Sequence, residues 1–274
     1  MNIANRIGLK ECLSLNLYCN EFIDGERLEK KLLSKLTKLK VFHFYFCISI
    51  LDNTFNIDNY IQTYKSSYWI NNNQSVLCFN QPLRKQYYCV FSLPYVFNML
   101  SYVSNDLVNY RSNVNDDILI YNNKAKIISF HGTVSFTFQL FEIIQKSCLK
   151  ATQLIFIDGS VPFFSDNLMN NELILKNIVV MLLFLVQLEY KYFKRLLLMT
   201  PNIRRLYILQ RVVLDVIRES QNKPNAFQQL QLICSPIRHV HIGRSSFEHD
   251  ALNDNGIKLL FPNAKLSRWR KNVI

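Results

Sequence analysis

Glycine and proline are scarce in this sequence of 274 residues. It contains only 6 glycines and 7 prolines, whereas all-β sandwiches with many tight turns usually need more of both. The low counts disfavour that class and favour helices or long strands joined by Asn and Ser turns. Hydrophobic residues make up 49% of the chain, and its length would suit one large domain or two small ones.

Signals of secretion are also missing. The seven cysteines are an odd number and include no short C-x-x-C pair, so free buried thiols in a reducing compartment explain them more simply than disulfides. The N-terminus has neither the apolar core nor the small-residue cleavage site of a signal peptide. We therefore expect a cytoplasmic or nuclear protein.

The longest apolar run is too short to cross a bilayer. It extends from Ile178 to Leu188 between Lys176 and Glu189, whereas a membrane helix needs roughly 20 residues. We interpret this run as a fully buried strand, or as a strand with part of a helix, and we expect no membrane partner.

The net charge of +12 comes from basic residues that are spread along the chain. Lysines alternate with Glu26 and Glu29 near residues 26–40, and another basic group lies at residues 265–271. Spread charge is typical of a solvated surface, whereas a nucleic-acid footprint needs clustering and usually aromatic partners. A basic nucleic-acid-binding module is therefore the alternative hypothesis for function.

A repeated unit of a turn and a strand organises the sequence. The stretch Met199–Leu209 enters a strand through Pro201 and Asn202, and Phe261–Lys265 repeats that turn. Strand-like segments centre on Ile128, Leu154, the apolar run near 179–188, Leu206, Val240 and Leu266. Most of these spacings lie near the period of a leucine-rich repeat, which is 20–29 residues. Apolar residues at helical spacing lie between several of these segments, so helices should connect the strands.

The first unit follows the same scheme. Leu13–Leu17 alternates as a strand does, leucines at helical spacing follow from Leu28 to Leu39, and Val41–Phe46 alternates again. A strand, helix and strand in this order normally place the two strands side by side and parallel. Residues 51–117 interrupt the period, and we interpret them as an insertion with a hairpin around residues 81–84.

These observations predict one α/β domain over residues 1–274. A unit of one strand and one helix cannot bury its apolar face alone, so the units should stack into a parallel sheet with the helices outside. The predicted fold is a leucine-rich-repeat-like solenoid, a short irregular horseshoe. A regular Asn after each strand is lacking, so we expect the side-chain ladder of the usual repeat to be missing or irregular.

Four segments in order resemble the repeat region of F-box/leucine-rich-repeat proteins. They are Leu39–Phe46, Cys89–Tyr95, Leu196–Leu206 and Leu260–Ala264, and the likeness covers the chain from about residue 10 to its end. The resemblance implies that the repeats present ubiquitination substrates. In that family an N-terminal F-box binds a Skp-type adaptor of a cullin ubiquitin ligase.

No F-box is expected ahead of the repeats, because the chain begins directly in a repeat strand. An internal stretch, Leu93–Val103, has the Leu-Pro opening and apolar spacing of a first F-box helix. It falls inside the insertion and is followed by polar Asn and Asp residues, which favours coincidence.

One exposed face is the candidate binding site. His239 and His241 lie two residues apart on one strand, and Arg205 and Tyr207 alternate with apolar residues on another. In a parallel sheet all four side chains should share a face. Tyr and Arg carry much of the binding energy at protein interfaces, so we predict a protein-binding face. The alternative is mere exposure, since half of any strand's residues must point outward.

No catalytic, cofactor or metal site is predicted. His239 and His241 could hold a metal only with a third ligand, for which His249 and Asp250 are the near candidates. Asp158 and Ser160 flank Gly159 without a histidine placed to complete a nucleophile and base. Cys148 could pair with His131, but a cysteine on the apolar side of a helix is more often part of the core.

Other motifs of enzymes and metal sites are also missing. Asp116 and Asp117 are most simply part of a solvated loop. The sequence contains no Gly-rich phosphate loop, EF-hand loop or zinc pattern. We therefore expect a non-catalytic interaction protein.

Overall fold

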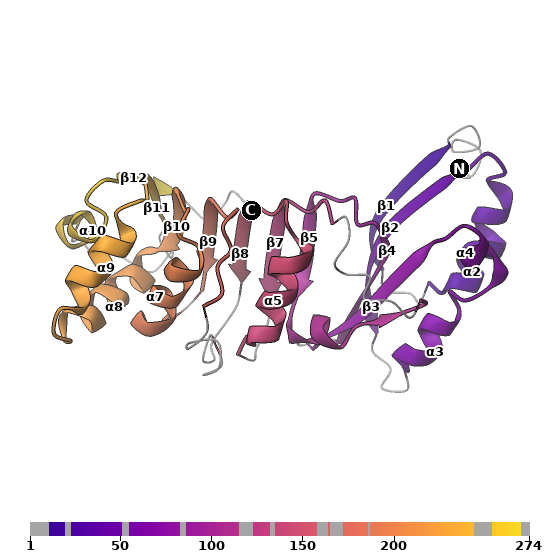
Figure 1. The fold of residues 1–274 in the computed structure, drawn as a ribbon, viewed down its shortest axis with the longest axis horizontal. Coiled ribbons are helices and arrows are strands. Elements are labelled where there is room, and N and C mark those ends of the chain that lie inside the picture. Colours follow the sequence, from indigo (N-terminus) through magenta and orange to yellow (C-terminus); the bar gives the residue numbers. More distant parts are fainter. Residues whose placement is uncertain are drawn as a thin grey trace.

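The computed structural model is a mixed α/β fold with one parallel and one mixed sheet (Figure 1). The structure describes residues 11–19, 23–50, 55–82, 86–114, 123–131, 135–157, 164, 172–185, 187–243 and 254–269. Within these ranges the larger sheet has seven strands and the smaller one five.

The seven-stranded sheet is parallel throughout and follows the chain almost strand by strand. Its order is β12-β11-β10-β9-β8-β7-β5. The strands are β5 (Met99–Val103), β7 (Ile127–His131), β8 (Gln153–Ile157), β9 (Val180–Phe184), β10 (Arg205–Leu209), β11 (His239–Gly243) and β12 (Lys265–Trp269).

The register of this sheet confirms the strand positions expected from the sequence. Leu154 lies opposite Ile128 on one side and Met181 on the other, and Leu206 lies opposite Met181 and Val240. Leu266 follows Val240 in the last pair. Each of these segments therefore lies beside the neighbour that the spacing predicts, in the same direction.

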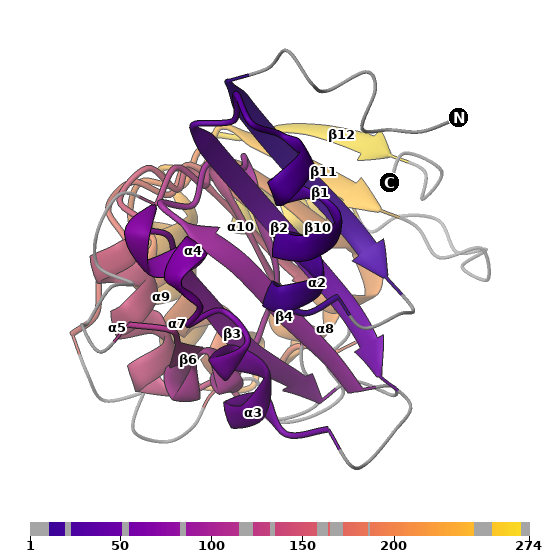
Figure 2. The ribbon, with the colours of Figure 1, turned by 90° about the vertical axis from the view of Figure 1, so that its right-hand side faces the viewer.

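Helices cover one side of the parallel sheet, as Figure 2 shows for α5, α7 and α9. The helices on this side are α5 (Phe138–Ser147), α7 (Tyr190–Met199), α8 (Gln210–Gln221), α9 (Ala226–Cys234) and α10 (Asp254–Leu260). Leu206 and Ile208 are fully buried against this layer, in one core with Val212 and Val213 of α8. Burial of each such side chain contributes roughly 1.5–3 kcal/mol, so this packing holds the helices in place.

The turns that precede the strands repeat a hydrogen-bond pattern. Two consecutive backbone N–H groups donate to one carbonyl at the start of the preceding strand. Thr152 and Gln153 both donate to Lys126, and Arg204 and Arg205 both donate to Val179. The recurrence shows that the strands begin in equivalent ways although the intervening segments differ in length.

Asparagines connect neighbouring turns on the same edge. The Nδ2 atom of Asn177 donates to the carbonyl of Leu149 at 2.7 Å, and that of Asn202 donates to Lys176 at 2.8 Å. Asn263 donates to Ser235 at 3.1 Å. This partial ladder precedes the strands, whereas the ladder that was expected to be missing or irregular is the one that follows each strand in the usual repeat.

The five-stranded sheet has the order β1-β2-β4-β3-β6. Its strands are β1 (Cys12–Cys19), β2 (Val41–Ile50), β3 (Ser75–Pro82), β4 (Gln86–Leu93) and β6 (Arg111–Ser112). The predicted parallel pairing of β1 with β2 and the predicted hairpin of β3 with β4 are both confirmed. Residues 83–85 of the hairpin turn lie outside the described residues.

The expectation that the first two strands continue the parallel sheet is wrong. The free edge of β2 pairs antiparallel with β4, so β1 and β2 belong to the smaller sheet. Strand alternation determines which side chains are buried, but it does not specify which strand becomes the neighbour.

Short helices cover one side of the smaller sheet: α2 (Gly25–Lys31), α3 (Ile57–Gln62) and α4 (Ser67–Asn71). The predicted helix over Leu28–Leu39 is shorter than expected, because α2 ends at Lys31 and only a 3₁₀ turn, η1 (Leu33–Lys35), follows. Phe44 and Trp69 are fully buried between this layer and the sheet.

The other side of the smaller sheet joins the main core. Tyr45, Phe79 and Phe91 belong to the same buried cluster as Phe130 of β7. The stretch that resembles an F-box helix lies at this junction. Leu93 ends β4, and Met99–Val103 is strand β5, with only a short 3₁₀ turn, η2 (Asn105–Asn109), after it.

Candidate interaction face

We call the side of the seven-stranded sheet that points away from the helices the strand face. Because side chains alternate along a strand, burial of Leu206 and Ile208 on the helix side turns Arg205 and Tyr207 to the strand face. The same alternation in the neighbouring strands completes the face. Its members on β8 to β12 are Gln153, Ile155, Ile157, Val180, Leu182, Phe184, Arg205, Tyr207, Leu209, His239, His241, Gly243, Lys265, Ser267 and Trp269.

The four residues chosen from the sequence lie together on this face. Arg205 is directly opposite His239, and Tyr207 is directly opposite His241. The rings of Tyr207 and His241 are stacked, with centroids 4.2 Å apart and planes 10° apart. Their common location is confirmed, whereas their role in binding remains a prediction.

His241 is held in a fixed position with its charge disfavoured. Its Nδ1 atom is 2.6 Å from the Ser267 hydroxyl of the next strand. Partial burial lowers the pKa of His241 below its ordinary value, and the neighbouring His239 and Arg205 lower it further. The neutral form of His241 is therefore favoured, and its flat ring stacks on Tyr207.

A hollow of about 310 Å³ lies beside the Tyr207 ring, and we call it the aromatic hollow. Val180 and Leu182 of β9 line it together with Tyr207. Phe184 and Trp269 lie at the end of the hollow near the carboxyl ends of the strands, and Gln153 and Arg205 lie at the other. The hollow therefore has an aromatic end and a polar end.

Trp269 reaches this hollow from the last strand of the sheet. Its ring lies across Gly243 and meets Phe184 edge to face, with centroids 5.4 Å apart. Its Nε1 donates a hydrogen bond to the His241 carbonyl at 3.2 Å. A Cβ atom at position 243 would lie 2.6 Å from the Trp269 ring, so glycine is needed here for a close approach.

A row of basic side chains borders the polar end. Arg205, His239 and Lys265 are in register on three neighbouring strands, and all three are exposed. Strands β7 to β12 contain no Asp or Glu. None of these three residues forms an ion pair with a described carboxylate.

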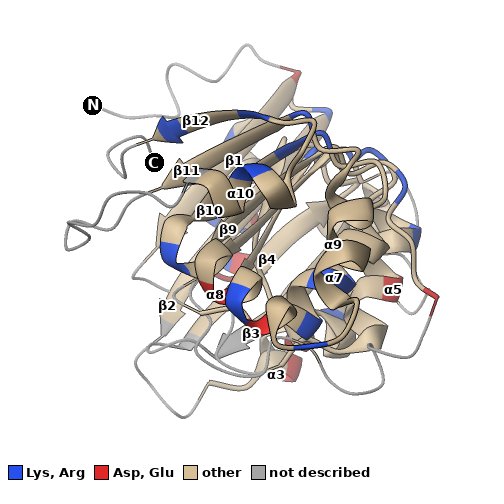
Figure 3. Ribbon diagram, turned by 90° about the vertical axis from the view of Figure 1, so that its left-hand side faces the viewer, with Lys and Arg blue, Asp and Glu red and all other residues tan. Residues whose placement is uncertain are grey.

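Elsewhere at this end of the molecule the basic residues are spread over several elements. Figure 3 shows Lys and Arg on the outer helices as well as on β12. The register-matched row on the strand face is thus a local feature within a generally basic surface.

A second pair of a tyrosine and a histidine occupies the opposite end of the strand face. The ring centroids of Tyr102 on β5 and His131 on β7 are 4.7 Å apart, and the Ser129 hydroxyl is 3.0 Å from Nε2 of His131. Tyr102 has a φ of 59°, which is unusual for a bulky residue. Tyr87 stacks on Tyr102 at 6.0 Å, so this pair is packed into the junction between the sheets.

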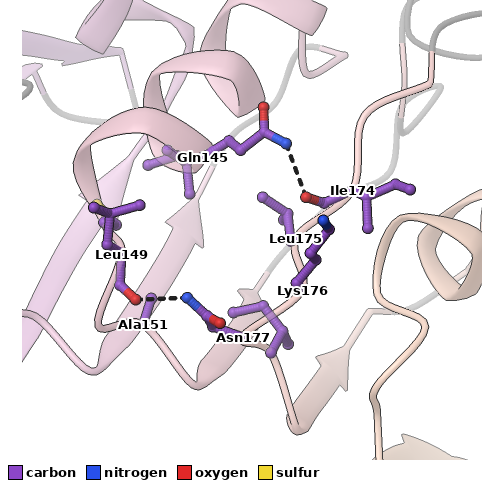
Figure 4. Close-up of a pocket in the computed structure, with 10 residues that line it drawn as sticks. Gln145, Leu149, Ala151, Ile174, Leu175, Lys176 and Asn177 are labelled. Carbon is purple, nitrogen blue, oxygen red and sulfur yellow. Dashed lines mark hydrogen bonds between the residues drawn. The ribbon is translucent and has the colours of Figure 1, made fainter.

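Another cavity, of about 270 Å³, lies between the end of α5 and residues 174–178 (Figure 4). Two hydrogen bonds cross it, from Gln145 to the Ile174 carbonyl and from Asn177 to the Leu149 carbonyl. Both polar side chains are therefore used in connecting successive units. Burial raises the pKa of the adjacent Cys148 thiol to about 12, so that thiol is a poor nucleophile at neutral pH.

The structure places some of the residues considered for a catalytic or metal site. Cys148 packs in the core and accepts a hydrogen bond from Asn123, whereas His131 lies on the sheet beside Tyr102. No group of three His, Cys, Asp or Glu side chains in the described part of the chain is placed to hold a metal. Residues 116, 117, 158, 160, 249 and 250 lie outside the described residues.

Two further expectations can be compared with the structure. None of the seven cysteines forms a disulfide, as expected, and five of them are buried, whereas Cys12 is exposed and Cys19 is half-buried. The apolar run near residues 178–188 is not fully buried, because only Met181 and Leu183 of β9 face the core while Leu182 and Phe184 face the aromatic hollow. None of the helices in the described ranges has the length and apolar character to cross a membrane.

Sequence reasoning missed Phe184, Lys265 and Trp269 as members of the site. The signal that could have found them is the register itself, since His239 aligns with Lys265 and Gly243 aligns with Trp269 of β12, while Phe184 lies two residues beyond Leu182 on the same face of β9. Neither a protein-family profile nor a curated protein nor a solved structure matches the chain significantly.

Proposed function

We propose that this chain is a non-catalytic interaction protein, in the form of a leucine-rich-repeat-like solenoid that binds another protein through its strand face. Parallel neighbours in chain order, equivalent turns and the partial asparagine ladder support the solenoid interpretation. The observation that carries the functional proposal is the in-register group of Arg205, Tyr207, His239 and His241 beside the aromatic hollow.

The chemistry of this group suits a protein partner. Tyr and Arg are enriched among the residues that contribute most of the binding energy at protein interfaces. Their contribution is largest where a well-packed pocket excludes water around them. Tyr207 is held rigid by His241, so it loses little conformational freedom when a partner binds. By the resemblance to F-box/leucine-rich-repeat proteins, the partner would be a ubiquitination substrate, and a Skp-type adaptor would accompany it.

Affinity capture with the chain tests this function. The double variant in which Tyr207 and His241 are both replaced by Ala should no longer capture the specific partners, because the stacked pair forms one wall of the site. A matched control is Tyr68→Ala, which removes a half-buried ring on α4 of the smaller sheet. Unchanged capture by the double variant would reject the strand face as the binding surface, and recovery of a Skp-type adaptor would support the family proposal.

The second candidate function is binding of nucleic acid. The row of Arg205, His239 and Lys265, which has no ion pair to a described carboxylate, is the observation that favours it. Contacts to phosphates release counterions, so affinity for nonspecific RNA or DNA should then fall steeply with salt. Binding of the captured partner that is insensitive to salt would favour the protein scaffold.

A further inference from the structure

We infer that the aromatic hollow and the basic row bind an extended acidic segment of the partner protein. A large apolar or aromatic side chain of that segment occupies the hollow, and a neighbouring carboxylate meets Arg205. This inference rests on the proposed function, and it specifies the chemistry of the partner.

The size of the hollow fits one side chain. Its volume of about 310 Å³ lies at the small end of the range for sites that hold whole small molecules, roughly 300–1,000 Å³. Its lining is mostly apolar, from Val180 and Leu182 to Phe184 and Trp269. Such a surface stabilises an aromatic or large aliphatic group and gives no orientation to a polar one.

The polar groups of the hollow lie at one end. Gln153, Val180 and Arg205 are in register across three strands, so an amide and a guanidinium flank an aliphatic floor. The distance along β9 from Val180 to Phe184 is about 13 Å, at roughly 3.3 Å per residue. An extended peptide advances about 13 Å over four residues, so an apolar residue and an acidic residue up to four positions away reach both ends.

The basic row selects for negative charge in the same segment. Neighbouring strands are about 4.8 Å apart, so the row of Arg205, His239 and Lys265 starts at the polar end of the hollow and extends roughly 10 Å away from it. No described carboxylate forms an ion pair with the charged Arg205 or Lys265. Acidic side chains of a partner would do so, and the complementary charge would also speed association.

The aromatic rings favour a peptide over a nucleic acid. Bases bind by stacking on ring faces, and one face of Tyr207 is covered by His241 at 4.2 Å. The Trp269 ring lies on Gly243 and meets Phe184 edge to face. The rings therefore form walls around an aliphatic floor and do not form a row of stacking platforms.

Selection from a random 12-residue peptide library displayed on phage tests the inference with the full chain as target. We expect the enriched peptides to carry Asp or Glu within four positions of Phe, Trp, Tyr or Leu. Synthetic copies should bind the wild-type chain, and Arg205→Glu should weaken them by about tenfold or more, because the charge at the polar end is reversed. Lys265→Glu is a second variant at an exposed position and should weaken them in the same direction.

Two charge reversals on the helix side serve as matched controls. Arg211→Glu on α8 and Lys258→Glu on α10 change the net charge equally at exposed positions away from the strand face. Both should leave peptide affinity unchanged within about twofold, because exposed charges at a distance are screened by salt.

The outcomes separate this inference from the proposed function. The inference of an acidic segment would be wrong in any of three cases: the enriched peptides lack acidic residues, no peptide is enriched, or Arg205→Glu leaves the peptide affinity unchanged. If enriched peptides without acidic residues lose binding when Tyr207 and His241 are both replaced by Ala, the strand face remains a protein-binding surface. If a 12-nucleotide oligouridine probe alone binds and loses binding with Arg205→Glu, both the inference and the protein-binding function fail.

Discussion

Replacing Gly243 with Ala should displace Trp269 from the sheet. The added Cβ would lie 2.6 and 2.7 Å from two carbons of the Trp269 ring and 3.0 Å from Leu209 Cδ2. Carbon atoms in favourable contact are about 3.5–4.0 Å apart, so the ring must move by about 1 Å or tilt away. Gly243 has no positive φ, so the effect comes from this overlap and not from backbone strain.

The cost follows from the contacts that Trp269 would lose. The hydrogen bond from its Nε1 to the His241 carbonyl is worth about 0.5–1.5 kcal/mol. The edge-to-face contact with Phe184 is worth about as much again, 0.5–1.5 kcal/mol. Alanine in a strand recovers about 0.5–1 kcal/mol relative to glycine. The net loss in the free energy of unfolding should be about 0.5–2 kcal/mol.

Urea unfolding measures this loss, and acrylamide quenching of tryptophan fluorescence reports the position of the ring. The chain has two tryptophans. Trp69 of α4 is fully buried against the smaller sheet, so a change in quenching reports Trp269. The control is Gly256→Ala, whose new Cβ would be 3.9 Å from Ile217 and free of clashes. Because Gly256 lies in α10, that variant should be as stable as the wild type or up to about 1 kcal/mol more stable. Equal stability and equal quenching for Gly243→Ala and the wild type would refute the packing of Trp269 across the sheet.

Three other predictions concern stability. Asn202→Ala should lower the free energy of unfolding in urea by about 0.5–1.5 kcal/mol, because the Lys176 carbonyl loses its donor. The control Asn222→Ala removes no comparable bond to a described residue and should cost under about 0.5 kcal/mol. Equal costs would contradict the asparagine ladder. Phe44→Ala should cost about 3–5 kcal/mol, because the ring is fully buried between Trp69 and its strand neighbours, and a cost below about 1 kcal/mol would contradict that core. Burial first, and then nearby positive charge, lower the pKa values of His43 and His241. At these two side chains the folded chain therefore binds protons more weakly than the unfolded chain, so the urea concentration at the unfolding midpoint should decrease when the pH is lowered from 7.5 to 5.5. An increase in that midpoint would refute these shifts.

Much of the parallel sheet is predictable from the sequence because its turns are local. Before each of β8 to β12, a backbone N–H one or two residues ahead of the strand donates to a carbonyl three positions earlier, as in Ile203 to Thr200 and Ala264 to Phe261. The turns before β10 and β12 have a Pro-Asn sequence, at residues 201–202 and 262–263. The spacing between the strand-like segments then predicts which strands are neighbours. For the same reason, strand alternation alone predicts that Arg205 and Tyr207 share a face with His239 and His241.

The remaining parts depend on contacts between residues that are far apart in sequence. Nothing local in β2 reveals that its edge pairs with β4 and not with another parallel strand. Likewise, Trp269 enters the site only because Gly243 leaves room for its ring to reach Phe184 across two strands. Such packing depends on side-chain volumes in three neighbouring strands, which no single-sequence pattern contains.

The indole N–H signals of Trp269 and Trp69 provide the most direct test of binding at the strand face. In the ¹⁵N-labelled chain, with Trp269→Phe used for assignment, titration with a selected acidic peptide should shift the Trp269 signal and leave that of Trp69 unchanged. Trp269 lines the aromatic hollow, whereas Trp69 is fully buried in the smaller sheet. A peptide that binds without moving the Trp269 signal, or that moves only the Trp69 signal, would contradict the strand face as the interaction surface.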